Sequence, residues 1–338
     1  MRRSAVVTGE VRQLVAEKRL DVLLLQEPYV RKQSHSHTFY GLGTGMRIAA
    51  VRSHHPWAAV ATCNPNWDML FVSQLSTTHC ACAEVRAPGF SFHVASCYFQ
   101  YSDEIEMHLR HLETVFHSLR GKRILVAVDA NARSSLWGPQ RTDERGAKFE
   151  DRIRANGMCV VNRAGQPPTF WTTRGSSFID VKLASPAMTQ FIGDWTVRRD
   201  WTTSDHSAVD IRLRVPRVAT GGDGCAGLTR FNVRWADWEV FTQSLSDLSR
   251  SRLEVLDLAS ASKVEDMAVT LAGVLTESCE AAMPRKKIFR KSNPWRTPEF
   301  PILKKRLYRL KRNLYLHWEP DDPTYLAIKR EYRSSSRN

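Results

Sequence analysis

Eight short apolar runs, spread over the first 215 residues, constrain the fold of this chain more than any other feature. They are DVLLLQ from Asp21, MRIAAV from Met46, DMLFVSQL from Asp68, CACAEV from Cys80, FSFHVASCYF from Phe90, RILVAV from Arg123, FIDVKLA from Phe178 and AVDIRLRV from Ala208. Runs of this length, rich in β-branched and aromatic residues, are typical of strands with at least one buried face. The pattern predicts a protein built around β-sheet.

Helical spacing appears between these runs. One amphipathic helix is predicted where apolar residues recur at intervals of four and three, at Ile105, Leu109, Leu112, Phe116 and Leu119. A second helical stripe, formed by Val11, Leu14 and Val15, leads into the first strand-like run. Strands alternating with helices indicate an α/β domain.

The periodicity stops at a glycine-rich stretch, RVATGGDGCAGL, over residues 217–228. We therefore expect one large domain over residues 1–215, a linker over 216–228, a helical segment over 229–283 and a basic helical segment over 284–338. At 338 residues, 42% of them hydrophobic, the chain is long enough to bury a sizeable core.

The charge is strongly basic and concentrated near the C-terminus. Lys and Arg number 49 against 35 Asp and Glu, which gives a net charge of +14. Residues 284–338 alone hold 16 basic and 5 acidic side chains. This balance favours a polyanionic partner, nucleic acid first and an anionic membrane second. Because no apolar run approaches the roughly 20 residues that a span requires, a membrane protein is not expected.

Polar residues that can do chemistry stand where several of the apolar runs end. They are Glu27, Asp129, Asn131, Asp180 and the group Thr203, Ser204, Asp205 and His206. Taken singly, each has an ordinary explanation, since an aspartate at a strand end often caps a turn and a lone histidine is usually structural. Tyr98 also has an ordinary explanation, as a half-buried core residue whose hydroxyl contacts water. Only their common order and placement suggests one site.

In that order, the motifs LQE, DAN, FIDVKL and SDH resemble the endonuclease/exonuclease/phosphatase superfamily, which includes abasic-site endonucleases and deoxyribonuclease I. The stretches SCYFQYSD, PPTFWTTRGSSFIDVKLASP and NPWRTPEF are similar to the endonuclease of non-LTR retrotransposons and to its linker toward reverse transcriptase. The resemblance spans residues 21–213. It implies a four-layer α/β sandwich, with two packed mixed sheets flanked by helices and a small, mainly helical C-terminal extension.

The resemblance also implies roles for individual residues. Glu27 would be a Mg²⁺ ligand, with Mn²⁺ as an alternative ion, and Asp205 would serve the metal or the neighbouring histidine. Hydrolysis of a phosphodiester needs a hard cation, an activated water and stabilisation of negative charge. Asp129 would orient and deprotonate the water. Asp180 would fix the orientation of His206, which would stabilise charge on the phosphate.

Four further residues match polar contacts of the family. Asn131 would hydrogen-bond the phosphate or the attacking water, and the hydroxyl of Tyr98 would contact the phosphate. Thr169 and Ser204 match smaller contacts near the substrate. The family begins with a strand that carries an Asn, whereas this sequence starts at the helix that follows it. We therefore expect the domain to lack its first strand, through a wrong start, a fragment or a decayed copy.

The predicted function is a metal-dependent DNA endonuclease that nicks one strand for target-primed reverse transcription of a retroelement. Two alternatives remain open at this point: a catalytically inactive, truncated fragment that binds nucleic acid, and a phosphodiesterase of the same fold that acts on another phosphate ester. The expected partners are DNA and, through the basic tail, the RNA of the element, with no membrane partner.

The tail itself allows two interpretations. Arg285, Lys286, Lys287, Arg290 and Lys291 form a cluster that is typical of a nuclear localisation signal or of a nucleic-acid contact. Further on, apolar residues at helical spacing, including Leu303, Leu307 and Leu310, favour a packed amphipathic helix instead. The seven cysteines contain no CxxC pair and indicate reduced thiols. We expect a nuclear protein that is cytoplasmic in transit.

Overall fold

The computed structural model describes residues 1, 3–33, 36–39, 42, 46–51, 55–215, 231–253, 261–284, 302–310 and 322–335. The chain divides into two compact units. One combines Met1–Gly222 with Asn293–Asn338, and the other is Asp223–Ser292. The expected linker at 216–228 and the basic cluster at 285–291 lie outside the described residues. The predicted catalytic, metal-binding and substrate-binding residues all belong to the first unit.

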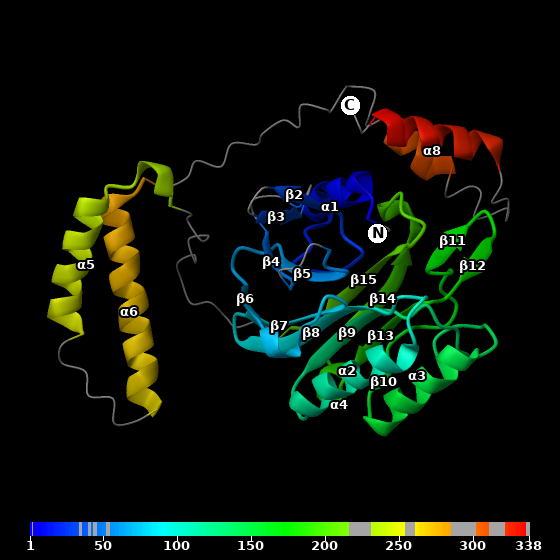
Figure 1. Ribbon diagram of the computed structural model, residues 1–338, viewed down its shortest axis with the longest axis horizontal. Coiled ribbons are helices and arrows are strands. Elements are labelled where there is room, and N and C mark those ends of the chain that lie inside the picture. The colour runs from blue at the N-terminus through cyan, green and yellow to red at the C-terminus, as the bar shows by residue number, and fades with distance from the viewer. Residues whose placement is uncertain are drawn as a thin grey trace. The chain divides into compact units, whose positions relative to one another are not determined.

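A six-stranded mixed sheet forms the centre of this unit (Figure 1). Its strands, in spatial order, are β10 (Cys159–Val160), β13 (Asp180–Ala184), β9 (Ile124–Asp129), β8 (Phe90–Tyr98), β7 (Cys80–Ala87) and β6 (Asp68–Phe71). Only β8 and β9 run parallel, and the other neighbours are antiparallel. Every residue of β9 and β13 is buried. These two strands are therefore covered on both faces, as continuous apolar runs predict.

A second layer of strands packs on one face of that sheet. It consists of β1 (Val22–Gln26), β5 (Ala58–Thr62) and β4 (Arg47–Ala49), together with the antiparallel pair β14 (Ile192–Arg198) and β15 (Ala208–Leu213). Between the layers, Val60 of β5 shares one apolar cluster with Phe92 and Val94 of β8 and with Ile211 of β15. This cluster joins the two layers of strands into a sandwich.

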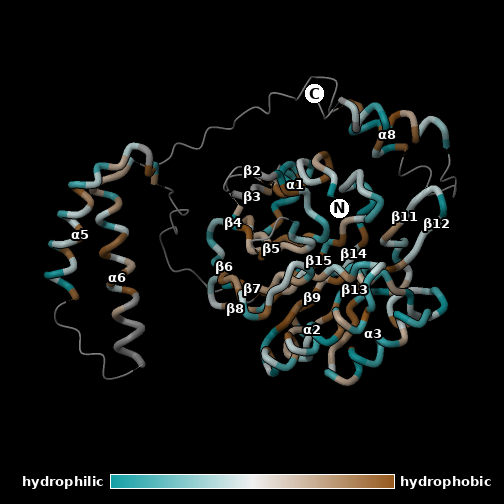
Figure 2. Tube along the Cα trace, in the orientation of Figure 1, coloured by the Kyte–Doolittle hydropathy of each residue, from teal (hydrophilic) through white to brown (hydrophobic). Residues whose placement is uncertain are grey.

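Helices cover both outer faces. The other face of the six-stranded sheet carries α2 (Ile105–Ser118) and α3 (Glu144–Ala155), whose fully buried Leu109 and Phe149 belong to the largest core cluster. On the far side, α1 (Ala5–Lys18) places Val11 against Leu23 and Leu25 of β1. In Figure 2 the strands of the two inner layers are largely hydrophobic, whereas hydrophilic and hydrophobic residues alternate along α2 and α3. The result is the expected four-layer α/β sandwich.

Each of the eight apolar runs contains a strand, and both helical stripes lie in helices. Several elements were not predicted: β5, β14, and the short strands β2 (Val30–Gln33), β3 (Ser36–Phe39), β10, β11 (Phe170–Thr172) and β12 (Gly175–Ser177). Three of the five residues of β5, AAVAT, are alanine, which has little strand propensity by itself. Burial on both faces decides its structure. The remaining short elements are α4 (Pro186–Thr189), η1 (Ser73–Leu75), η2 (Arg199–Trp201) and η3 (Val233–Trp235).

A cavity of about 680 Å³ separates β1 from β15. Among the described strands, β1 is hydrogen-bonded only to β5 and β15 only to β14, so each presents one edge toward this space. Asp129, Asp180 and His206 also line the cavity. The expectation that the domain lacks its first strand stays a prediction.

Part of the C-terminal segment packs on the same unit. Residues 302–310 and α8 (Pro323–Ser335) are helical, and their apolar faces meet around Leu307, Tyr325, Ile328 and Tyr332. Trp171 of β11 and Val6 of α1 join this cluster. The packed amphipathic helix therefore accounts for residues 302–310.

The second unit contains two paired helices, α5 (Trp238–Arg252) and α6 (Ala261–Ala282). Arg252 at the end of α5 forms a bidentate ion pair with Glu277 of α6, at 2.7 and 3.0 Å. Asp237 caps the start of α5 by accepting hydrogen bonds from two backbone amides of its first turn. None of the helices in the described ranges is long and apolar enough to span a membrane.

Candidate active site

The site begins at two strand ends that have an unusual backbone. Glu27 directly follows β1 and has φ of 50°, and Asn131, two residues beyond β9, has φ of 44°. Side chains other than glycine rarely adopt this left-handed conformation, and each instance costs on the order of 1 kcal/mol or more. Such residues concentrate at functional sites, where the surrounding structure holds them in place.

Strand register brings three of the predicted residues side by side. Asp129 at the end of β9 lies opposite Asp180 of β13 in the antiparallel pair. On its other side, the parallel register places Tyr98 of β8 beside Asp129. Because neighbouring strands are only about 4.8 Å apart, the three side chains share one edge of the sheet.

His206 reaches this edge from the loop between η2 and β15. Its Nδ1 lies 3.1 Å from Oδ2 of Asp180, and its Nε2 lies 3.6 Å from Oδ2 of Asp129. The ring also packs on Phe170, at 4.7 Å between centroids. The predicted pairing of Asp180 with His206 is therefore present. The carboxylate of Asp129 faces the other ring nitrogen, Nε2.

Burial and mutual charge set the protonation of this group. Burial raises the pKa of Asp129 to about 6, with a contribution from Asp180 that the His206 ring opposes. Burial alone would raise the pKa of Asp180, but the His206 ring more than offsets it and the pKa is lowered. Burial would likewise lower the pKa of His206, yet the two carboxylates raise it. His206 is thus held toward its charged form between two acids.

The donor set fits a divalent cation. One ligand atom each from Glu27, Asp129 and His206 lies within 4.8 Å of the others. Oδ1 of Asp129 is buried and has no hydrogen-bond partner within the part of the chain that the structure describes. A buried carboxylate oxygen left without a partner is costly, and a cation would satisfy it. Carboxylate oxygens are the ligands that hard divalent ions prefer.

Tyr98 and Asn131 flank this cluster in different ways. The Tyr98 side chain is buried beside Glu27, and burial followed by the Glu27 charge raises the pKa of its hydroxyl. Tyr98 therefore keeps its proton and can donate a hydrogen bond. The side-chain nitrogen of Asn131 donates to the backbone oxygen of Phe99 at 3.0 Å. This bond fixes the amide at the edge of the site.

Thr169 and Ser204 support the two main side chains. Thr169 is fully buried, and its hydroxyl accepts a hydrogen bond from the backbone nitrogen of Asp180 at 3.2 Å. The hydroxyl of Ser204 accepts one from the backbone nitrogen of His206, also at 3.2 Å. In this structure both residues hold the backbone of the pair formed by Asp180 and His206. Their predicted contacts with substrate stay predictions.

Asp205 lies apart from the metal cluster. Oδ1 of its carboxylate forms an ion pair with Nζ of Lys329 on α8, at 2.8 Å. Its backbone oxygen accepts a hydrogen bond from Trp171. The structure therefore gives Asp205 a basic side chain as partner, and its predicted role toward the metal or the neighbouring histidine stays a prediction.

Two residues of the site were not predicted from the sequence. Lys182 lines the same cavity from β13, and burial lowers the pKa of its amine although Asp180 and Asp129 oppose the shift. Its position two residues after Asp180 places both on one strand face, so this signal was available. Gln26 donates to the hydroxyl of Ser96 on β8 at 2.9 Å and so anchors the strand end that carries Glu27.

Comparison with known proteins agrees with this geometry. Residues 92–210 match the family model described as Endonuclease-reverse transcriptase. The structure is similar to that of the endonuclease domain of TRAS1, a telomere-specific non-LTR retrotransposon, with a TM-score of 0.57 and 26% identity over 64% of this chain and 95% of that one. Over this part, the chain is similar to endonucleases of the endonuclease/exonuclease/phosphatase superfamily.

Two curated proteins are also similar to this chain in sequence. The Retrovirus-related Pol polyprotein from type-1 retrotransposable element R1 of Bradysia coprophila is 26% identical over 59% of this chain. The Putative 115 kDa protein in type-1 retrotransposable element R1DM of Drosophila melanogaster is 24% identical over 86% of this chain. The chain spans 21% and 28% of the lengths of these two relatives.

Proposed function

We propose that this chain is a metal-dependent DNA endonuclease. The observation that carries the proposal is the convergence of Glu27, Asp129 and His206 within 4.8 Å, with Asp180 hydrogen-bonded to the far nitrogen of His206. Acids and a charged histidine at one sheet edge can activate a water and stabilise negative charge at the same place. Hydrolysis of a phosphate ester requires both.

Each side chain has a distinct part in the reaction. Asp129, whose pKa burial raises to about 6, is ionised at pH 7 and takes the proton of the attacking water. His206, in its charged form, donates a hydrogen bond to an oxygen of the phosphate as negative charge develops. Asp180 keeps the imidazole ring oriented by accepting from its Nδ1. Tyr98 contributes a hydroxyl donor beside Glu27.

The cation would be held by Glu27 and Asp129, with His206 within reach. When bound, a divalent ion supplies Lewis-acid polarisation of the phosphate and neutralises its charge. We propose Mg²⁺, because the two carboxylates supply hard oxygen donors and leave room for waters. Mn²⁺ is the alternative, because carboxylate and water oxygens suit it as well.

The proposed substrate is DNA, cut in one strand to leave a 3′ hydroxyl that can prime reverse transcription of a retroelement. Support comes from the similarity to the TRAS1 endonuclease domain and from the net charge of +14. We further propose that the basic cluster at Arg285–Lys291 contacts element RNA or directs the protein to the nucleus after synthesis in the cytoplasm.

Nicking of supercoiled plasmid tests the proposal. The full chain is expected to convert supercoiled to open-circular DNA with Mg²⁺ and to lose this activity in EDTA. Asp129→Ala and His206→Ala should each lower the rate by at least about 10³-fold, the range of a lost general base or charge stabiliser. Asp151→Ala and His117→Ala, both exposed, are matched controls that should keep the wild-type rate.

The affinity for a short DNA duplex, measured in EDTA, distinguishes variants that lose catalysis from variants that lose their fold. It should stay within about twofold of wild type for all four variants, because each loses one unit of charge or less. Nicking that persists in EDTA would contradict metal dependence. A wild-type chain that binds DNA but never nicks it would instead support the nucleic-acid-binding fragment.

A further inference from the structure

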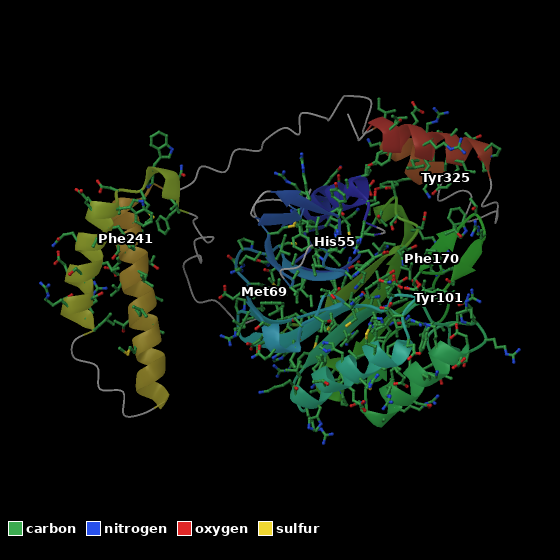
Figure 3. All side chains as sticks on the ribbon, viewed as in Figure 1. His55, Met69, Tyr101, Phe170, Phe241 and Tyr325 are labelled. Atoms are coloured by element: carbon green, nitrogen blue, oxygen red, sulfur yellow. The ribbon has the colours of Figure 1, made fainter. Side chains whose placement is uncertain are left out.

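The loop that carries His206 is held from two sides, one of which is far away in the sequence. On the near side, the backbone nitrogen of Trp171 in β11 donates to the backbone oxygen of Asp205 at 2.9 Å. The backbone nitrogen of Ser207 donates to the backbone oxygen of Thr169 at 2.7 Å. On the other side lie α1 and the C-terminal helix α8. Figure 3 labels Phe170 on β11 and Tyr325 on α8, the two elements between which this loop runs.

The first contact from α8 is the ion pair between Lys329 and Asp205, the residue directly before His206. The Nζ to Oδ1 distance is 2.8 Å, and the two side chains are 15% and 10% exposed. The Coulomb attraction within an ion pair so shielded from water is stronger than within a surface pair. Removing only one partner leaves an uncompensated charge in a largely dry place, which disturbs the loop around it.

The second contact passes through a buried acid of α1. Glu10 is 6% exposed, and its carboxylate accepts three hydrogen bonds. Two come from the backbone nitrogen and hydroxyl of Thr203, at 3.0 and 2.7 Å, and the third comes from the hydroxyl of Tyr332 on α8, at 2.6 Å. Thr203 stands three residues before His206. One carboxylate thus ties α1, the loop and α8 together.

A third link lies at the start of the same loop. The hydroxyl of Tyr308, in the helix over 302–310, approaches the backbone oxygen of Trp201 at 3.5 Å. Apolar packing of Leu307, Tyr325 and Tyr332 keeps both C-terminal helices on this face. The contacts at Trp201, Thr203 and Asp205 therefore follow the loop along its length.

We propose that the C-terminal helices at 302–310 and α8 are a positioning element of the nuclease, acting on His206 through Lys329 and Tyr332. The inference rests on the proposed function, because it concerns the residue that stabilises charge on the phosphate. His206 must keep its two nitrogens near Asp180 and Asp129. A displacement of about 1 Å in such a residue can cost on the order of 100-fold in rate.

The decisive variant is Lys329→Met in the full chain, which keeps the length of the side chain and removes its charge. Its kcat for plasmid nicking is expected to fall about tenfold or more while KM changes less than threefold, because DNA contacts are untouched. Lys329→Arg should restore at least a third of the wild-type kcat. Arg330→Met, an equal loss of charge at the exposed neighbouring position, should keep it. Tyr332→Phe, like Lys329→Met, should lower kcat relative to wild type.

Hydrogen exchange gives a readout that does not depend on activity. Peptides covering 199–207 should exchange faster in Lys329→Met than in the wild type or in Arg330→Met. Unchanged exchange there, a kcat within twofold of wild type, or equal losses in Lys329→Met and Arg330→Met would each overturn the proposal. If the wild-type chain does not nick DNA, the proposed function fails, and the exchange comparison alone decides whether α8 orders the loop.

Discussion

Replacement of His108 by phenylalanine is expected to remove a defined part of the pH dependence of stability. The His108 ring is 4% exposed, lies against Phe99 at 5.0 Å between centroids, and faces Asp103 at 3.3 Å. Burial, helped by the nearby His79 ring and opposed by Asp103, lowers the pKa of His108 from 6.5 to about 4. The folded protein therefore binds this proton more weakly than the unfolded chain does.

The sign and size follow from linkage. Below pH 6.5 the unfolded chain takes up a proton that the folded state refuses, so stability falls as the pH decreases toward 4. At about 1.36 kcal/mol per pH unit, the 1.5 units between 6.5 and 5.0 lower the free energy of unfolding by about 2 kcal/mol. Phenylalanine has no proton to bind and keeps the ring stacked on Phe99.

Urea denaturation followed by tryptophan fluorescence, at pH 7.5 and 5.0, measures the effect. Wild type should lose about 2 kcal/mol more than His108→Phe between these two values. His79, whose pKa is also lowered by burial, is present in both proteins and cancels. His117→Gln, at an exposed position of the same helix, should behave as wild type. Equal losses in wild type and His108→Phe would refute the assignment.

Three other perturbations have expected outcomes. Ser96→Ala removes two hydrogen bonds that hold β1 to β8 and should lower the free energy of unfolding by about 1 to 3 kcal/mol in urea titrations. Gly146→Ala would drive its new methyl group into the carbonyl oxygen of Arg133, so it should lower Tm although alanine favours helices, and a higher Tm would contradict the packing. Replacing the exposed Lys305 and Arg306 by glutamine should flatten the slope of log affinity for DNA against log salt by about one to two units if this helix contacts DNA, whereas an unchanged slope would exclude that contact.

Eight of the strands and the helix α2 could be predicted because their signals are local. A run such as RILVAV is apolar throughout because β9 is covered on both faces, and the spacing of Leu109, Leu112 and Phe116 follows one side of α2. The four polar motifs could be located for the same reason, since each follows such a run. Their convergence depends on strand order, which the resemblance to a known family supplied.

The long-range contacts that hold the His206 loop in place could not be predicted from local sequence patterns. Glu10 in α1 has no sequence feature that links it to Thr203, 193 positions later, or to Tyr332. Likewise, Asp205 stands in a motif whose family role concerns metal, and only the packing of α8 reveals Lys329 as its partner. Such contacts arise when distant segments fold onto one another, so periodicity and spacing carry no record of them.

The first compact unit is discontinuous in the sequence, because Met1–Gly222 and Asn293–Asn338 flank a second unit. This interruption affects the order of events during synthesis. At roughly 5 to 20 residues per second, a ribosome needs roughly 6 to 20 s to extend the chain from residue 222 to residue 335. Over that interval the sandwich can form its core while Thr203 and Asp205 still lack their partners on α8. The His206 loop would then be the last part of the nuclease to mature, so nicking activity would arise only after α8 has left the ribosome.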